Sequence, residues 1–332
     1  MGLAAIAAWS WASEQAEAQR KSGAEITTSA NAAVADESRR GRLAAVRTWG
    51  YQLRQIVPTE IAASAYDLVV IDYSNDRRYN MEWPLPPADV ATMQQRPDGR
   101  RRIMLSYLSV GEAEDYRNYW QWEWLEAPAN RPSWLGRENP EWEGNYPVKF
   151  WDVGWQSMMF GGPEKYLDSI IRAGFDGVYL DRVDVYSEWG KTNPKAETEM
   201  VKFIERLSAY ARRLNPEFMI IIQNGEELVR HASVRKAIDG VAKESLFYGV
   251  NGADVANPEA EIGFSLGHLR TARKAGGLVL LVEYAKADAA RAEISRRAAM
   301  EGLPLLLTHR DLGDGNQPEQ PPGSPTAPRG NN

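Results

Sequence analysis

Residues 174–184 constrain the fold most, because the chain there changes from a helical to an extended pattern and ends in carboxylates. The preceding residues 163–173 place apolar side chains at helical spacing, with Pro163 in the first turn and Gly174 as the stop. After Gly174 the period is two, so Asp181 lies on the same face as alternate apolar residues. An apolar strand that ends in a carboxylate is how an α/β barrel builds a catalytic site. The alternative is that Asp181 and Asp184 only cap a turn.

The whole chain repeats this pattern of apolar strands separated by helical segments. Nine segments predict strands: 47–53, 66–74, 102–109, 147–152, 174–181, 218–223, 238–244, 277–283 and 303–308. Helices are predicted at 88–95, 163–173 and 193–214, the last with Asn193 as its cap. This alternation is typical of an α/β fold with a parallel sheet, and so many strands favour a single (β/α)8 barrel over an open doubly wound sheet. Because a barrel has eight places, either the extra strand lies outside it or one prediction is wrong.

Composition and motifs exclude several classes of protein. The 332 residues contain 43% apolar and 25% charged side chains, as expected of a globular protein, and the net charge of −6 argues against a nucleic-acid binder. There are no cysteines, which excludes disulfides and thiolate metal sites, and three histidines argue against a histidine-rich metal site. No glycine-rich dinucleotide or phosphate-binding motif follows any predicted strand. We therefore expect a monomer that uses no cofactor and no metal.

The two ends of the chain differ in composition from the centre. In residues 1–43, a short apolar run at 3–12 precedes Ala16-Glu17-Ala18, which is similar to a signal-peptidase site, but no basic residue comes before the run. We expect a secreted or periplasmic protein whose signal peptide is incomplete here, followed by a linker at 20–40; an ordinary helix is the alternative. Residues 44–311 are predicted to form the barrel domain, with no membrane span. The Gly-, Pro- and Asn-rich residues 312–332 predict a disordered tail.

Polar side chains gather at or just past the C-terminal ends of the predicted strands. They are Asp72, Glu112, Asp152, Asp181, Gln223, Asn224, Glu244 and Glu283. In a barrel these ends surround the mouth, where loops build the active site. The simpler reading is that strands become polar wherever they leave the core, which accounts for some of these residues. It accounts less well for Glu244, because Gly240 and Ala242 share its strand face and suit a narrow barrel interior.

The predicted loop after the third strand is long and rich in aromatic residues. Between Glu112 and Tyr146 it carries Tyr116, Tyr119, Trp120, Trp122, Trp124, Trp134 and Trp142, and Trp151 and Trp155 could extend the set. Aromatic rings stack on the apolar faces of sugars, but they also pack loops onto barrels. We expect most of these rings to be structural and one or two to be exposed in the cleft.

Carboxylates and aromatic rings without metal or thiol ligands suggest glycoside chemistry, which needs two carboxyl groups beside the scissile bond. Asp181 and Glu244 form the best pair. Their strands are separated by one other strand, so inward-pointing side chains could face each other across a sugar.

The chain resembles glycoside hydrolase family 114, the endo-α-1,4-polygalactosaminidases, and especially its bacterial branch of barrel proteins. The resemblance covers roughly residues 45–310. It is carried by WGYQL (49–53), YDLVVIDYS (66–74), LSYLSVGEAEDYR (105–117), VKFWD (148–152), GFDGVYLDRVDVY (174–186), QNGEEL (223–228) and KESLFYG (243–249). It implies a (β/α)8 barrel that hydrolyses α-1,4-linked galactosamine polymers, with Asp181 as nucleophile or base and Glu244 as general acid.

Seven further residues are candidate substrate contacts: Asp72, Tyr107, Glu112, Asp152, Asp184, Asn224 and Glu283. Asp184 could instead orient Asp181. Clustered carboxylates would attract the ammonium groups of a cationic amino-sugar polysaccharide and would raise the pKa of one member, as a general acid requires. Two alternatives stay open: a glycosidase that acts on another glycan, and a non-catalytic glycan-binding barrel.

Overall fold

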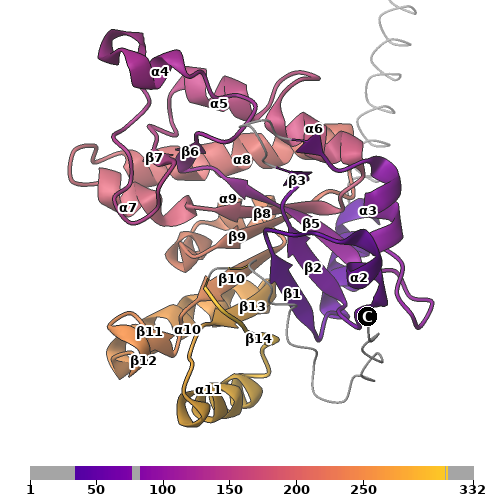
Figure 1. Ribbon diagram of the computed structural model, residues 1–332. Coiled ribbons are helices and arrows are strands. Elements are labelled where there is room, and N and C mark those ends of the chain that lie inside the picture. Colours follow the sequence, from indigo (N-terminus) through magenta and orange to yellow (C-terminus); the bar gives the residue numbers. More distant parts are fainter. Residues whose placement is uncertain (1–33, 77–82, 311, 313–332) are drawn as a thin grey trace, which may run out of the picture.

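The computed structural model describes residues 34–76, 83–310 and 312 (Figure 1). Eight strands form one sheet in the order β1-β2-β5-β8-β9-β10-β13-β14, and all neighbours are parallel. Their bounds are β1 Trp49–Gln52, β2 Leu68–Ile71, β5 Ile103–Ser109, β8 Gly177–Asp181, β9 Met219–Gln223, β10 Gly240–Glu244, β13 Leu278–Glu283 and β14 Leu305–Leu307. β14 returns beside β1, where the Leu53 N–H donates to the Leu312 carbonyl at 2.9 Å. The sheet is therefore a nearly closed α/β barrel, as predicted.

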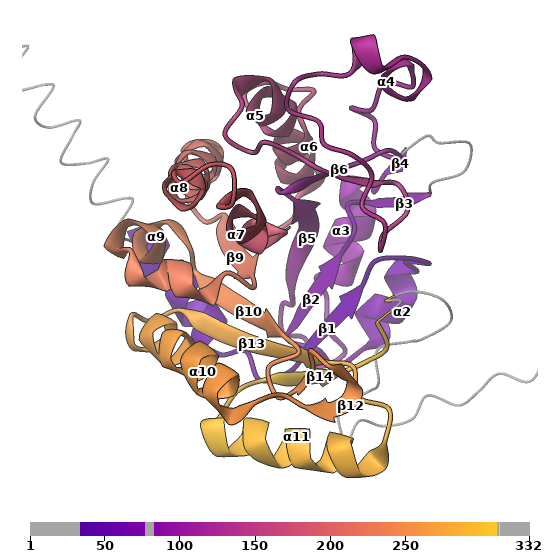
Figure 2. The same cartoon turned by 90° about the vertical axis from the view of Figure 1, so that its left-hand side faces the viewer.

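Helices surround the strands, and short hairpins extend the loops (Figure 2). The helices are α2 Pro58–Ala63, α3 Pro87–Met93, α4 Glu123–Glu126, α5 Val153–Met159, α6 Tyr166–Ala173, α7 Tyr186–Trp189, α8 Ala196–Leu214, α9 Ala232–Ala237, α10 Glu259–Lys274 and α11 Asp288–Glu301. Single 3-10 turns are η2 Pro128–Asn130, η3 Val183–Val185 and η4 Glu226–Arg230. The hairpins pair β3 Ser74–Asp76 with β4 Trp83–Pro84, β6 Glu112–Glu114 with β7 Asn145–Pro147, and β11 Tyr248–Gly249 with β12 Gly252–Ala256.

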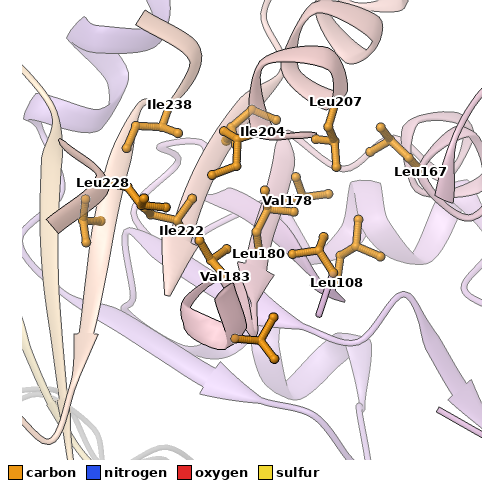
Figure 3. Packing of buried hydrophobic residues seen from close by; sticks show 14 of the residues in the cluster. Leu108, Leu167, Val178, Leu180, Val183, Ile204, Leu207, Ile222, Leu228 and Ile238 are labelled. Atoms are coloured by element: carbon orange, nitrogen blue, oxygen red, sulfur yellow. The ribbon is translucent and has the colours of Figure 1, made fainter. Parts of the chain in front are cut away.

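The period of two in each strand divides the core into an inner and an outer part. Tyr51, Tyr179 and Ala242 belong to the cluster inside the barrel. Outward side chains such as Val178 and Leu180 pack on helices α6 and α8, as the close view shows (Figure 3). Gly177 begins β8 where the neighbouring strand approaches closely, since a Cβ there would lie 2.2 Å from the Met219 carbonyl oxygen. Burial on both sides explains why these strands are continuously apolar.

The fourth predicted strand, at 147–152, is wrong as a barrel strand. Its first residue pairs in the β6–β7 hairpin, and Phe150 is buried in the outer core. Asp152 then begins α5, with its Oδ1 accepting from the Gly154 N–H at 2.8 Å. The last predicted strand, at 303–308, is the eighth barrel strand, β14. An apolar run that is short and ends in a helix cap cannot be told from a strand by its pattern alone.

Other differences from prediction are local. α6 and α8 begin at Tyr166 and Ala196, a few residues after the predicted Pro163 and Asn193. Residues 34–40, predicted as linker, belong to a helix over 34–44 in which Arg39 is buried and its Nε donates to Asp239 Oδ1 at 3.1 Å. The predicted signal peptide lies outside the described residues, as does the predicted tail beyond Leu312. Within the described residues, no helix combines the length and apolarity that crossing a bilayer requires.

Candidate active site

A cavity of about 700 Å³ lies at the C-terminal ends of the barrel strands, and we call it the cleft. Six of its lining residues come from or directly follow six different barrel strands: Tyr51, Tyr107, Asp181, Gln223, Glu244 and Tyr284. Each of them belongs to the set of alternate residues that faces the inside of the barrel. The period of two that fills the barrel with apolar side chains therefore also places polar groups at its mouth.

Asp181 is held in the cleft by three hydrogen bonds. Its Oδ2 accepts from the Tyr107 hydroxyl at 2.7 Å, and its Oδ1 accepts from the Arg182 N–H at 2.7 Å and from Gln223 Nε2 at 3.0 Å. Burial, followed by the negative charge of Glu244, raises the pKa of Asp181 to about 7. The three donors favour the charged form but only partly offset these two effects.

Glu244 faces the same space from β10. Its Oε2 accepts from Gln223 Nε2 and from Asn224 Nδ2, both at the long distance of 3.4 Å. Asn224 has a left-handed backbone with φ of 56°, a conformation that Asn tolerates, and its Oδ1 accepts from the Glu244 N–H at 3.2 Å. One amide group, Gln223 Nε2, therefore lies between the two carboxyl groups and contacts both.

A second group of charges lines the outer part of the cleft. Glu112 accepts from Asn139 Nδ2 at 2.9 Å and lies 3.2 Å from Arg182 Nε. Burial raises the pKa of Glu112, and the positive charge of Arg182 opposes that change. Asp184 also lines the cleft, 4.0 Å from Arg182 Nη1. Of the nine predicted site residues, the cleft thus contains Tyr107, Glu112, Asp181, Asp184, Asn224 and Glu244.

The other three predicted site residues lie outside the cleft lining. Asp72 is fully buried, and its Oδ1 accepts from Arg117 Nη1 at 2.8 Å. Asp152 caps helix α5. Glu283 accepts from the Phe247 N–H at 2.8 Å and thereby holds the turn after β10; burial raises its pKa to about 7. These acids end strands or precede a helix, but their partners belong to the scaffold, so we assign them no contact with substrate.

Most of the aromatic residues after β5 pack the loop onto the barrel, as expected. Trp120, Trp124, Trp134 and Trp155 are buried in a chain of ring contacts with centroids 5.0–5.3 Å apart. Trp151 packs against Trp189 and does not extend the cleft wall. Tyr116 and Trp142 do line the cleft.

Several cleft residues had no role assigned from the sequence. Gln223 was visible as a strand end, but only the register, with Leu180 opposite Ile222, puts it beside Asp181. Tyr51 and Tyr284 look like ordinary core aromatics in the sequence, and Arg182 looks like surface charge. Their common signal is position: each stands at the C-terminal end of a barrel strand.

Comparison with known proteins supports these observations. The model of glycoside-hydrolase family GH114 matches residues 27–321. An uncharacterized protein of Methanocaldococcus jannaschii is 41% identical over 243 residues, which cover 71% of this chain and 66% of that protein. An uncharacterized protein of Deinococcus radiodurans is 35% identical over 279 residues, which cover 83% and 84%.

A solved structure has the same fold. The glycoside hydrolase domain of PelA from Pseudomonas aeruginosa superimposes with a TM-score of 0.59 at 18% identity, covering 80% of this chain and 96% of that domain. This likeness concerns the barrel, whereas the family match extends over most of the sequence. The chain belongs to glycoside-hydrolase family GH114.

Proposed function

We propose that this protein is an endo-acting glycoside hydrolase of an α-1,4-linked, galactosamine-containing polysaccharide. In this proposal Glu244 is the general acid and Asp181 is the nucleophile or base. The observation that carries it is the pair of carboxyl groups at the ends of β8 and β10, which face one cleft and contact the same Gln223 amide.

The hydrogen bonds support this division of roles. Both oxygens of Asp181 accept hydrogen bonds, which fix the carboxyl group in one position for attack on the anomeric carbon or on a water. Glu244 accepts two contacts at the long distance of 3.4 Å through Oε2 and also interacts with the Tyr284 hydroxyl. Its contacts to the two amides are longer than those of Asp181, which suits a group that carries a proton toward a substrate. Two carboxyl groups that face one cleft can provide both the acid and the nucleophile or base that glycoside hydrolysis requires.

The reaction then follows from the two roles. Glu244 donates its proton to the glycosidic oxygen as the bond from that oxygen to the anomeric carbon breaks. Asp181 either attacks the anomeric carbon, or removes a proton from the water that does so. In both routes the hydroxyl group of water ends on the anomeric carbon, and the remaining proton returns the pair to its starting state.

The charge of the cleft supports a cationic substrate. Nine carboxylates line it (Glu112, Glu114, Glu138, Glu141, Glu143, Asp181, Asp184, Glu188 and Glu244), against three arginines (Arg54, Arg182 and Arg310). Confined negative charge concentrates cations and speeds their binding. A polymer of de-N-acetylated galactosamine carries ammonium groups that would be attracted in this way.

The test is a substrate screen with matched variants. Partly deacetylated galactosaminan, chitosan and a neutral α-glucan are each incubated with wild type, Asp181→Asn, Glu244→Gln and the control Asp288→Asn, and released oligosaccharides are measured. Asp288 lies at the start of the outer helix α11. We expect release from galactosaminan, a loss of about 10²- to 10⁴-fold in the two cleft variants, and no change in the control.

Each other outcome overturns a part of the proposal. Release only from a neutral glycan would refute the amino-sugar substrate. Full activity of Glu244→Gln would refute the acid assignment. Binding of galactosaminan by wild type without release of products from any glycan would make the protein a binding barrel.

A further inference from the structure

Trp142 is an exposed aromatic residue in a segment where three other tryptophans are buried. Its exposed fraction is 46%, whereas Trp120, Trp124 and Trp134 are at most 8% exposed. It lines the same cleft as Asp181 and Glu244. Packing of the loop onto the barrel therefore does not account for the position of this ring.

The turn that carries Trp142 is held in place by several hydrogen bonds. Asn139 accepts from the Glu141 N–H at 3.0 Å through Oδ1, and its N–H donates to the Asn145 carbonyl at 2.7 Å. Asn139 Nδ2 also donates to Glu112 Oε1 at 2.9 Å, which ties the turn to the segment that directly follows β5. The ring thus lines the cleft on an ordered support, which is what a binding surface requires.

A cation from a distant part of the chain already lies on this ring. The guanidinium of Arg310 stands 5.7 Å from the Trp142 ring centroid, within the range of cation–π contacts. Arg310 follows β14, and two residues later the Leu312 carbonyl accepts from Leu53 next to β1. Three glutamates close to Trp142 in sequence (Glu138, Glu141 and Glu143) line the same cleft. A positive charge over an indole ring, near carboxylates, is also what a sugar with an ammonium group would present.

We infer that Trp142 is a stacking platform for an ammonium-bearing sugar of the substrate, remote from the scissile bond, and that Arg310 occupies it until the polymer displaces it. This inference rests on the proposed function and adds a second binding position to it. Arg310 is a suitable temporary occupant because it shares the charge of the ligand and sits on a short segment held near Leu53.

The test separates binding from chemistry. Trp142→Ala should raise KM for long galactosaminan roughly fivefold to thirtyfold, with kcat unchanged, because stacking with a cation contributes to binding but not to the reaction. The effect should disappear on the shortest oligosaccharide that is cleaved, and Trp142→Phe should retain most of the affinity. The matched control is Trp122→Ala, which removes a 43% exposed tryptophan of the same loop outside the cleft lining and should change neither constant.

Substitution of Arg310 tests whether the polymer displaces this guanidinium from Trp142. Arg310→Ser should lower KM for the cationic polymer roughly twofold to fivefold, because the polymer no longer competes with the guanidinium. Its control is Arg213→Ser, which removes a cation 4.9 Å from the Tyr210 ring on helix α8 and should have no effect. Equilibrium binding of galactosamine oligomers to the same substitutions in the Asp181→Asn background gives a readout that does not need hydrolysis.

The outcomes distinguish this inference from the proposed function. If wild type cleaves galactosaminan but Trp142→Ala keeps the wild-type KM, the platform is refuted and the proposed function stands. If Arg310→Ser raises KM, Arg310 is itself a ligand for the sugar, and the displacement is wrong. If wild type cleaves only neutral glycans, the proposed substrate is wrong. If, in addition, Asp181→Asn and the double variant Asp181→Asn/Trp142→Ala bind cationic oligomers equally well, the platform is refuted as well.

Discussion

At the residue scale, the site depends on how one amide group divides its contacts between two acids. Gln223 Nε2 reaches Asp181 Oδ1 at 3.0 Å and Glu244 Oε2 at 3.4 Å. Because the negative charge of Glu244 disfavours ionisation of the neighbouring Asp181, Asp181 keeps its proton to a higher pH than an isolated Asp would. Burial and the charge of Glu244 together raise the pKa of Asp181 from 3.8 to about 7.

The pH dependence of hydrolysis tests the state of Asp181. A raised pKa means that Asp181 is protonated below about pH 7 and becomes charged as the pH rises through that value. Because a nucleophile or base must be charged, we expect kcat to rise as the pH approaches 7, by about tenfold per pH unit. In Gln223→Leu this limb should move to higher pH, because Asp181 loses a donor that favours its charged form. An unmoved limb in this variant would show that Gln223 does not influence the pair.

At the element scale, the connection between β5 and β8 shows how similar acids acquire different roles. It contains the β6–β7 hairpin, helix α4, the Trp142 turn and helices α5 and α6, where a simple barrel needs one helix. Asp152 lies within this insertion. It ends an apolar run, as Asp181 does, but its side chain caps the N-terminus of helix α5.

Asp152→Ala should therefore cost stability and spare activity. Loss of the cap on the Gly154 N–H should lower the free energy of unfolding by about 1 kcal/mol. Asp152→Ser, which can also cap, should restore most of it, and both variants should keep the wild-type kcat and KM. Denaturant unfolding and steady-state kinetics on the same samples provide the measurement. A raised KM in Asp152→Ser at unchanged stability would return Asp152 to the substrate contacts.

At the scale of the whole molecule, charge is distributed unevenly. The net charge of −6 is modest for 332 residues, yet nine carboxylates and only three arginines line the cleft. Arg39, Arg42 and Arg101 pair instead with Asp239 and Asp176, which lie at the N-terminal ends of β10 and β8. The fold thus neutralises the far end of the barrel and leaves the mouth negative.

Ionic strength should reveal this asymmetry. For a cationic polymer, kcat/KM should fall roughly tenfold between 0.05 and 0.5 M NaCl, because added salt shortens the range of the attraction. A short neutral oligosaccharide, if it is cleaved at all, should show almost no such dependence. Equal salt dependence for both substrates would mean that the charge of the cleft does not contribute to recognition.

Much of the fold could be read from local patterns. The bounds of the eight barrel strands lie within three residues of their predicted positions, because alternation and apolar runs are properties of neighbouring residues. The same reasoning put Asp181 and Glu244 on inward faces two strands apart, and the structure brings both to the cleft. The same reasoning failed at 147–152, because Phe150 is buried in the outer core and gives this loop segment the apolar pattern of a strand.

The sequence by itself determined the barrel, the family and the inward direction of the two acids, since these follow from periodicity and from motifs along the chain. Only the tertiary structure decided which acids meet. Asp72 and Asp181 both end apolar strands. Asp72 is neutralised by Arg117, which is 45 positions away in the chain. Asp181 instead lies beside Gln223 and Glu244. Likewise Trp120 and Trp142 look alike in sequence, and one is buried while the other meets Arg310. Such partners are distant in the chain, and local pattern carries no information about them.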